Sequence, residues 1–110
     1  MDIETDGYYQ YGILWSQGMQ DSIEFTVDTL IDLDSATAIF TIWASYTDTE
    51  TIFLDTMQIG THSVRTFISD SLTDTLSGTF PADVWIETSA GRKLQIWYKY
   101  ISIETSSRGR

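Results

Sequence analysis

The stretch FPADVWIETSAGRKLQIWY, residues 80–98, decides the fold class. In its first half, apolar residues recur at every second position: Phe80, Ala82, Val84 and Ile86. They recur with the same period in its second half: Leu94, Ile96 and Tyr98. A period of two is typical of strands with one buried face, because successive side chains of a strand point to opposite sides of the sheet. Ser89-Ala90-Gly91 between the halves favours a tight turn, so the stretch predicts an antiparallel hairpin.

Further strand patterns lie upstream of the hairpin, at residues 23–27, 38–43, 52–54 and 64–68. Aromatic residues make up 14% of the chain and Thr and Ser are abundant, a composition that favours strands over helices. The 110 residues suit one domain, and without any cysteine its stability must come from packing. We therefore expect an all-β fold, a single antiparallel β-sandwich, Ig-like or jelly-roll-like, of about seven or eight strands.

Two segments depart from the strand pattern. In residues 70–77, Leu72 and Leu76 stand four apart behind capping-type residues, which predicts one short helical turn closed by Gly78 at the C′ position. In the last apolar run the phase of the alternation slips, which predicts a bulge or a crossing between sheets near residues 98–101.

The chain divides into an N-terminal arm (1–12), a sandwich domain (13–104) and a basic C-terminal tail (105–110). The arm carries three tyrosines, Tyr8, Tyr9 and Tyr11. Trp15 follows in a short apolar segment that forms either a first strand or a contact surface. The first residues are acidic and no apolar run approaches about 18 residues, so we expect neither a signal peptide nor a membrane span.

The net charge of −10 makes nucleic acid and anionic lipid unfavourable partners, since both would repel most of the surface. The charge is unevenly distributed. Residues 1–91 hold one base and fifteen acids, whereas residues 92–110 hold five bases and one acid. This asymmetry suits a contact between the tail of one copy and an acidic surface elsewhere.

The sequence holds no motif of a known catalytic or cofactor site. His62, the only histidine, lies in a loop-like Gly-Thr-His-Ser segment, and no nucleophile elbow, phosphate-binding glycine loop or zinc pattern occurs. Asp28, Asp32 and Asp34 are close enough in sequence to supply oxygen ligands to calcium, but they do not match a calcium-loop spacing. We therefore expect no enzyme activity, no catalytic residue, no cofactor and no metal, and leave cation binding by these aspartates open.

Trp85 and Trp97 are out of phase with the apolar rows of the predicted hairpin, so both are expected on its outer face. There they form either a stabilising cross-strand pair or part of a contact patch. Because exposed tryptophans on a sheet also stack on sugars, a carbohydrate-binding module is the alternative to a protein-binding domain.

Residues 17–105 resemble the N-terminal β-sandwich domain of phage baseplate upper proteins and related small virion proteins. The resemblance rests on the order of four segments: Gln17-Gly18-Met19-Gln20-Asp21 opening a strand, residues 31–38 (IDLDSATA) leading into a second, residues 72–80 (LTDTLSGTF) before a third, and a final hairpin built on Ala90-Gly91-Arg92. That family is structural, brings no catalytic residues and occurs in multi-copy assemblies.

The resemblance implies a bacteriophage virion protein, either a capsid decoration or cement protein or a small tail or baseplate adaptor. Its partners would be other virion proteins and copies of itself, and it would be made in the host cytoplasm. The residues expected at such interfaces are aromatic or basic: Tyr8, Tyr9, Tyr11, Trp15, Trp85, Trp97, Arg108 and Arg110.

The basic tail generates a first testable prediction. Replacing both Arg108 and Arg110 by glutamate should leave the fold intact and weaken association between copies or with a partner, since each exposed ion pair contributes only about 0–1 kcal/mol and is screened by salt. Assembly measured across a salt titration should show the largest loss at low ionic strength. Identical assembly of the double variant and the natural chain at every salt concentration would show that the tail charge is incidental.

Overall fold

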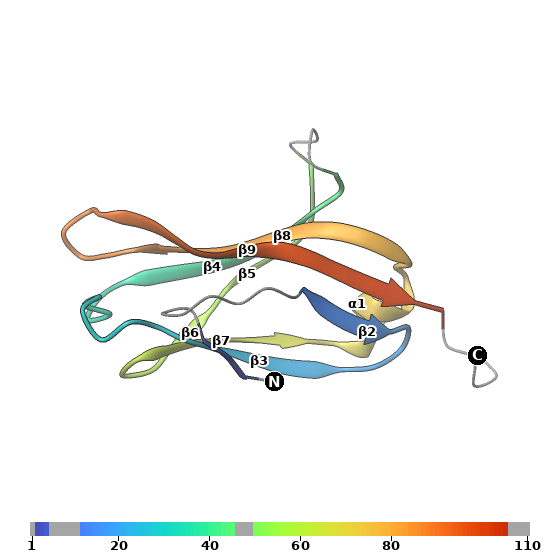
Figure 1. Cartoon of the computed structure of the whole chain (residues 1–110), viewed down its shortest axis with the longest axis horizontal. Coiled ribbons are helices and arrows are strands. Elements are labelled where there is room, and N and C mark those ends of the chain that lie inside the picture. Colours follow the sequence, from blue (N-terminus) through green and yellow to red (C-terminus); the bar gives the residue numbers. More distant parts are fainter. Residues whose placement is uncertain (1, 5–11, 46–49, 106–110) are drawn as a thin grey trace.

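A computed structural model describes residues 2–4, 12–45 and 50–105, and it has the all-β sandwich fold that the alternation predicts. Two layered sheets are visible in Figure 1. The elements in chain order are β1 (Asp2–Glu4), β2 (Ile13–Ser16), β3 (Asp21–Thr26), β4 (Thr37–Trp43), β5 (Thr51–Thr56), β6 (Gln58–Ile59), β7 (Ser63–Ile68), α1 (Asp70–Asp74), β8 (Gly78–Glu87) and β9 (Lys93–Glu104). The strands that the sequence pattern missed are the two shortest, β1 and β6.

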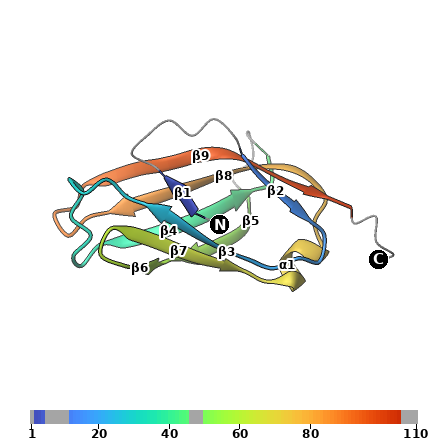
Figure 2. The same cartoon turned by 60° about the horizontal axis from the view of Figure 1, so that its bottom comes forward.

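The small sheet has the strand order β1-β3-β7-β6, and the large sheet has the order β2-β9-β8-β4-β5. Most neighbours are antiparallel, but β1 pairs parallel with β3 and β2 pairs parallel with β9. The chain thus contributes one N-terminal strand to the edge of each sheet (Figure 2). This corrects the predicted boundary at residue 12, because Asp2–Glu4 belongs to the sandwich. Within the part of the chain described, no helix is long and apolar enough to cross a membrane.

The β8–β9 hairpin forms as predicted, but its register shifts between Val84 and Trp85. Val84 pairs with Trp97 and Trp85 pairs with Gln95, which leaves Ile96 as the extra residue of a β-bulge. After Ile96, the side chains of β9 that an uninterrupted alternation would place on the outer face point into the core, and those that it would place in the core point outward. The expected bulge or sheet crossing at residues 98–101 is therefore wrong: the bulge lies before residue 97, and β9 stays in the large sheet throughout.

The core between the sheets is centred on three aromatic rings. Phe25 of β3 lies 5.3 Å from Trp97 of β9 and 6.2 Å from Phe40 of β4, measured between ring centroids. Rows of aliphatic side chains from both sheets surround them: Ile13, Ile23, Ile42, Val64, Ile68, Ala82, Val84, Ile86, Ile101 and Ile103. The Thr66 hydroxyl adds a hydrogen bond of 2.6 Å across the sandwich, donated from β7 to the Asp55 carboxylate of β5.

Helix α1 confirms the helical turn expected near residues 70–77. The hydroxyl of Ser69 caps it by accepting a hydrogen bond from the Leu72 N–H, and the buried Thr73 donates to the carbonyl of Met19. The predicted C′ glycine is wrong, because the helix ends at Asp74 with Thr75 as its C-cap. Gly78 instead begins β8 with a φ of 114°, a backbone angle that favours glycine.

Gly12 supplies a prediction for the edge of the large sheet. A Cβ added there would overlap the backbone carbonyl of Tyr100, so Gly12→Ala must push β2 away from β9 and should lower the free energy of unfolding by about 1–3 kcal/mol. Gly60→Ala is the matched control, since its Cβ would come close to the Ser63 hydroxyl, at 2.9 Å, which can turn away, and would meet the Ser63 carbonyl only at an ordinary contact distance of 3.6 Å. Thermal melting of the two variants should differ clearly, and equal melting temperatures would contradict the tight contact.

Candidate binding face

The outer face of the large sheet, the upper side of the sandwich in Figure 1, is rich in apolar and aromatic side chains. Leu54 is 56% exposed, Trp85 43%, Tyr98 47% and Tyr100 42%. We call this surface the aromatic face and define it by nine residues of β4, β5, β8 and β9: Ile39, Thr41, Trp43, Leu54, Asp83, Trp85, Gln95, Tyr98 and Tyr100. Several exposed apolar and aromatic side chains on one face are typical of an interaction site.

The outer face of the small sheet has a different character. There Glu24 of β3 accepts a hydrogen bond of 2.8 Å from Arg65 of β7 in an exposed ion pair, and serine and threonine flank them. Phe67, 58% exposed, is the large apolar side chain exposed on that face of β3 and β7. The two outer faces therefore differ, although both belong to one sandwich and both meet solvent.

One row of side chains crosses the aromatic face from strand to strand. Leu54 is the register partner of Thr41, Thr41 is that of Asp83, and Asp83 is that of Tyr98. The two central members of the row, Thr41 and Asp83, are buried even though they point outward. Exposed apolar groups thus flank a carboxyl group that is shielded from water.

The Asp83 carboxyl is held by side chains of the same face. Trp85 Nε1 donates to Asp83 Oδ2 over 3.2 Å, and Gln95 Nε2 approaches the same oxygen at 3.5 Å. Burial raises the pKa of Asp83, while the nearby N–H groups of Trp85, Trp43 and Gln95 oppose that shift in part because they favour the ionised form. Oδ1 accepts no hydrogen bond from the residues that the structure describes. This carboxyl is therefore only half satisfied.

A cavity of about 450 Å³ opens on the aromatic face, lined in part by Thr41, the register partner of Asp83. Its walls are mostly apolar and include Ile39, Leu54 and the Trp85 side chain. Glu87 and Lys93, register partners across the β8–β9 ladder, also line it and add one charge of each sign. The cavity can accept an apolar or aromatic group without burying an unpaired charge.

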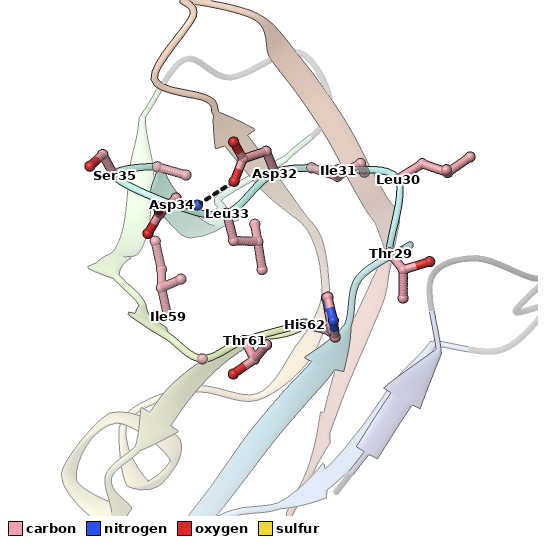
Figure 3. Close-up of a pocket in the computed structure, with 12 residues that line it drawn as sticks. Thr29, Leu30, Ile31, Asp32, Leu33, Asp34, Ser35, Ile59, Thr61 and His62 are labelled. Carbon is pink, nitrogen blue, oxygen red and sulfur yellow. Dashed lines mark hydrogen bonds between the residues drawn. The ribbon is translucent and has the colours of Figure 1, made fainter.

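A larger cavity, about 730 Å³, lies at one end of the sandwich between the loops 29–36 and 59–62 (Figure 3). Its lining is largely polar, and it includes the predicted cation candidates Asp32 and Asp34 together with His62. Asp28 and Asp32 use their side chains locally: each accepts a backbone N–H two residues further on, at 2.9 Å. The residues described contain no group of three or more His, Asp or Glu placed to hold a metal ion.

Of the predicted interface residues, the structure places Trp85 on the aromatic face and two others elsewhere. Trp97 is 5% exposed and stacks in the core, because the bulge at Ile96 turns it inward, so its predicted outward position is wrong. Trp15 is 1% exposed and forms part of β2, which settles its alternatives in favour of a strand. The others lie outside the described residues: Tyr8, Tyr9, Tyr11, Arg108 and Arg110.

Sequence reasoning assigned none of the other eight members of the face to an interface, and four of them show why. Tyr98 was assigned to the buried row with Leu94 and Ile96, but it is exposed because the same bulge inverts the phase of β9. Tyr100 follows it outward at the next position of that phase. Leu54 and Asp83 carried no signal beyond alternation, since each becomes distinctive only through its neighbours on adjacent strands.

No protein-family model matches the chain, and no curated protein matches it. Among solved structures, that of murine CRIg is similar to this chain with a TM-score of 0.43 and 14% sequence identity, over 86% of this chain and 92% of that one. So distant a likeness carries no argument about function. What the molecule can bind must be derived from its own faces.

The Asp83 carboxyl generates a prediction about stability and pH. Since its pKa in the folded protein lies above the ordinary value of 3.8, the folded state holds this proton more tightly than the unfolded chain. Its contribution to the free energy of unfolding is therefore full at low pH and is lost as the pH rises through the raised pKa. Asp83→Asn cannot ionise, so it should gain stability relative to the natural chain as the pH rises from about 4 to 7.

Urea unfolding at several pH values measures this difference. Asp34→Asn, in the exposed loop before β4, controls for the removal of one negative charge and should show a smaller pH dependence. If Asp83→Asn tracks the natural chain at every pH, Asp83 is as well hydrated in the folded state as in the unfolded chain.

Proposed function

We propose that this chain is a non-catalytic protein-binding domain and that it serves as a structural component of a bacteriophage virion. The observation that supports binding is the contrast between its two outer faces: the aromatic face exposes Leu54, Trp85, Tyr98 and Tyr100, whereas the small sheet presents mainly polar groups. Tryptophan and tyrosine dominate the energetics of protein interfaces, and they are poor choices for a surface that stays in water.

The virion setting is supported by the sequence resemblance of residues 17–105 to small phage virion proteins. In a multi-copy assembly, a face of modest size is used many times, so weak individual contacts add to a stable structure. A capsid decoration protein and a tail or baseplate adaptor, the two roles proposed from the sequence, would both dock through such a face.

The ionisable groups of the two sheets fit binding better than catalysis. His62 lies in the loop that joins β6 to β7 of the small sheet, and Asp83 lies on the outer face of the large sheet. A general base needs to stand within hydrogen-bond reach of the group it activates. Asp83 instead contacts an indole and an amide, which position a carboxyl but do not relay a proton.

The double variant Leu54→Ser/Tyr98→Ser tests the proposal. It removes two anchors of the aromatic face without touching the core, so virions made with it should carry at least about tenfold less of the chain, if each lost anchor costs about 1 kcal/mol or more. Phe67→Ser is the matched control, because Phe67 is equally exposed on the other face. Quantitative mass spectrometry and immunoelectron microscopy of purified virions give the readout, with melting temperatures to confirm folding.

Two results would contradict the proposal. If the natural chain is absent from purified virions, the proposal that it is a virion component is wrong. Equal incorporation of the Leu54→Ser/Tyr98→Ser chain, the Phe67→Ser chain and the natural chain would remove the aromatic face as the docking surface.

A carbohydrate-binding module is the second candidate. It is favoured by one local arrangement, the exposed indole of Trp85 beside the carboxyl of Asp83 and the amide of Gln95, which offers a stacking surface together with hydrogen-bonding groups. Saturable binding of the isolated domain on a glycan array, abolished by Trp85→Ala, would favour this candidate over the structural one.

A further inference from the structure

The orphaned oxygen of Asp83 is the feature of the aromatic face that its apolar character does not explain. Asp83 is 6% exposed, its Oδ2 is held by Trp85 and Gln95, and its Oδ1 has no hydrogen-bond partner among the described residues. A buried acceptor without a partner is destabilising, and more so when the group is charged. A threonine at position 83, like its register partner Thr41 on β4, would occupy the same place in the sheet without burying a carboxyl group.

The surroundings select the kind of group that would satisfy this oxygen. The missing partner must be a hydrogen-bond donor, and a cationic donor gives the stronger bond to a carboxylate. Indole rings belong to the same site, since the side chains of Trp85 and Trp43 both lie near the Asp83 carboxyl. A guanidinium fits both features, because its planar fork donates to carboxylates and its face stacks on aromatic rings.

The other charges on this face do not compete for such a group. Glu87 and Lys93 stand opposite each other on the β8–β9 ladder and offset each other's charge. Tyr98, the register partner of Asp83 on β9, adds neither a carboxyl nor an amino group to the face. A cation arriving at the face therefore finds Asp83 as the acid at the centre of an apolar surface, within a chain whose net charge is −10.

The same carboxyl argues against a second copy of this chain as the occupant. A two-fold contact centred on this row would bring two Asp83 carboxyls toward each other inside an apolar interface. Two like charges in such surroundings repel unless one is protonated. Binding to a basic side chain of a different protein gives the buried carboxyl an opposite charge as its partner, whereas self-pairing would bury two such carboxyls together.

We infer that the aromatic face binds its partner protein through an arginine side chain, whose guanidinium pairs with the Asp83 carboxylate and lies against the Trp85 indole, while an apolar neighbour of that arginine fills the cavity beside Leu54. The inference rests on the proposed function and names the chemistry of the partner. Because Asp83 is buried, entry requires side chains of the face to change rotamer, and such changes are common at interfaces.

The first experiment uses the full chain and three small probes: N-acetyl-arginine amide, N-acetyl-lysine amide and N-acetyl-citrulline amide. Citrulline has the shape of arginine without its charge. The NMR signal of the Trp85 indole N–H, assigned by its loss in Trp85→Phe, should shift saturably with the arginine probe at about 1–20 mM, a range expected for a single side chain. The lysine probe should bind more weakly, and the citrulline probe should leave the signal in place.

Asp83→Asn should lower the affinity for the arginine probe at least about tenfold, as expected when one partner of a buried charge pair is removed. Asp34→Asn, on the loop away from this face, should bind as the natural chain does. Because the comparison of arginine with citrulline uses the unmodified chain, it stands even if a variant folds poorly. An equal response to arginine and citrulline, or no saturable shift up to about 50 mM arginine probe, would overturn the inference.

Incorporation into virions separates this inference from the function on which it rests. Loss of incorporation in both Asp83→Asn and Leu54→Ser/Tyr98→Ser supports both. Normal incorporation of Asp83→Asn, with loss in Leu54→Ser/Tyr98→Ser, sinks the arginine contact and keeps the docking face. If the natural chain sediments as a dimer that Tyr98→Ser dissociates, the occupant is a second copy and the inference is wrong.

Discussion

The contact of Trp97 with Phe25 and Phe40 is the interaction on which the rest of this structure depends. Phe25 comes from the small sheet and the other two rings come from the large one, so these contacts join the layers at their centre. Trp97 reaches this place only because Ile96 is left out of the β8–β9 register. Its indole N–H is buried without a hydrogen-bond partner among the described residues, which indicates that packing outweighs the cost of that unsatisfied donor.

The same bulge creates the candidate binding surface. Because each side chain of a strand faces opposite to the next, turning Trp97 inward turns Tyr98 and Tyr100 outward, where they join Trp85 and Leu54. Core and binding face are therefore two results of one irregularity in the ladder. A change that straightened β9 would damage both together, whereas substitutions at the exposed members of the face should leave the core unchanged.

Alternation in the sequence was sufficient to predict the sandwich, the final hairpin, the buried row of β8 and the helical turn at α1, because these features follow from local periodicity and capping. It was insufficient for Trp97 and Tyr98, since a bulge is a property of two paired strands and one strand does not reveal where the extra residue falls. The parallel partners of β1 and β2 were also out of reach, because those pairings join segments far apart in the chain. Asp83 resembled any outward-facing acid until Trp85 and Gln95 were placed around it.

The parallel pairing of β2 with β9 has a consequence for the order in which the protein can fold during synthesis. Of the strands described, β2 is among the first to leave the ribosome and β9 is the last. Until β9 emerges, Ile13 and Trp15 lack the strand that they pair with in the finished sheet, and two large apolar side chains remain open to wrong contacts. Closure of so long a loop is slow compared with local hairpins, so the nascent chain can form β3 with β7, and β4 with β5, well before its N-terminal edge is secured. We therefore expect the N-terminal edge of the large sheet to be most open to wrong contacts in the interval before the last strand emerges.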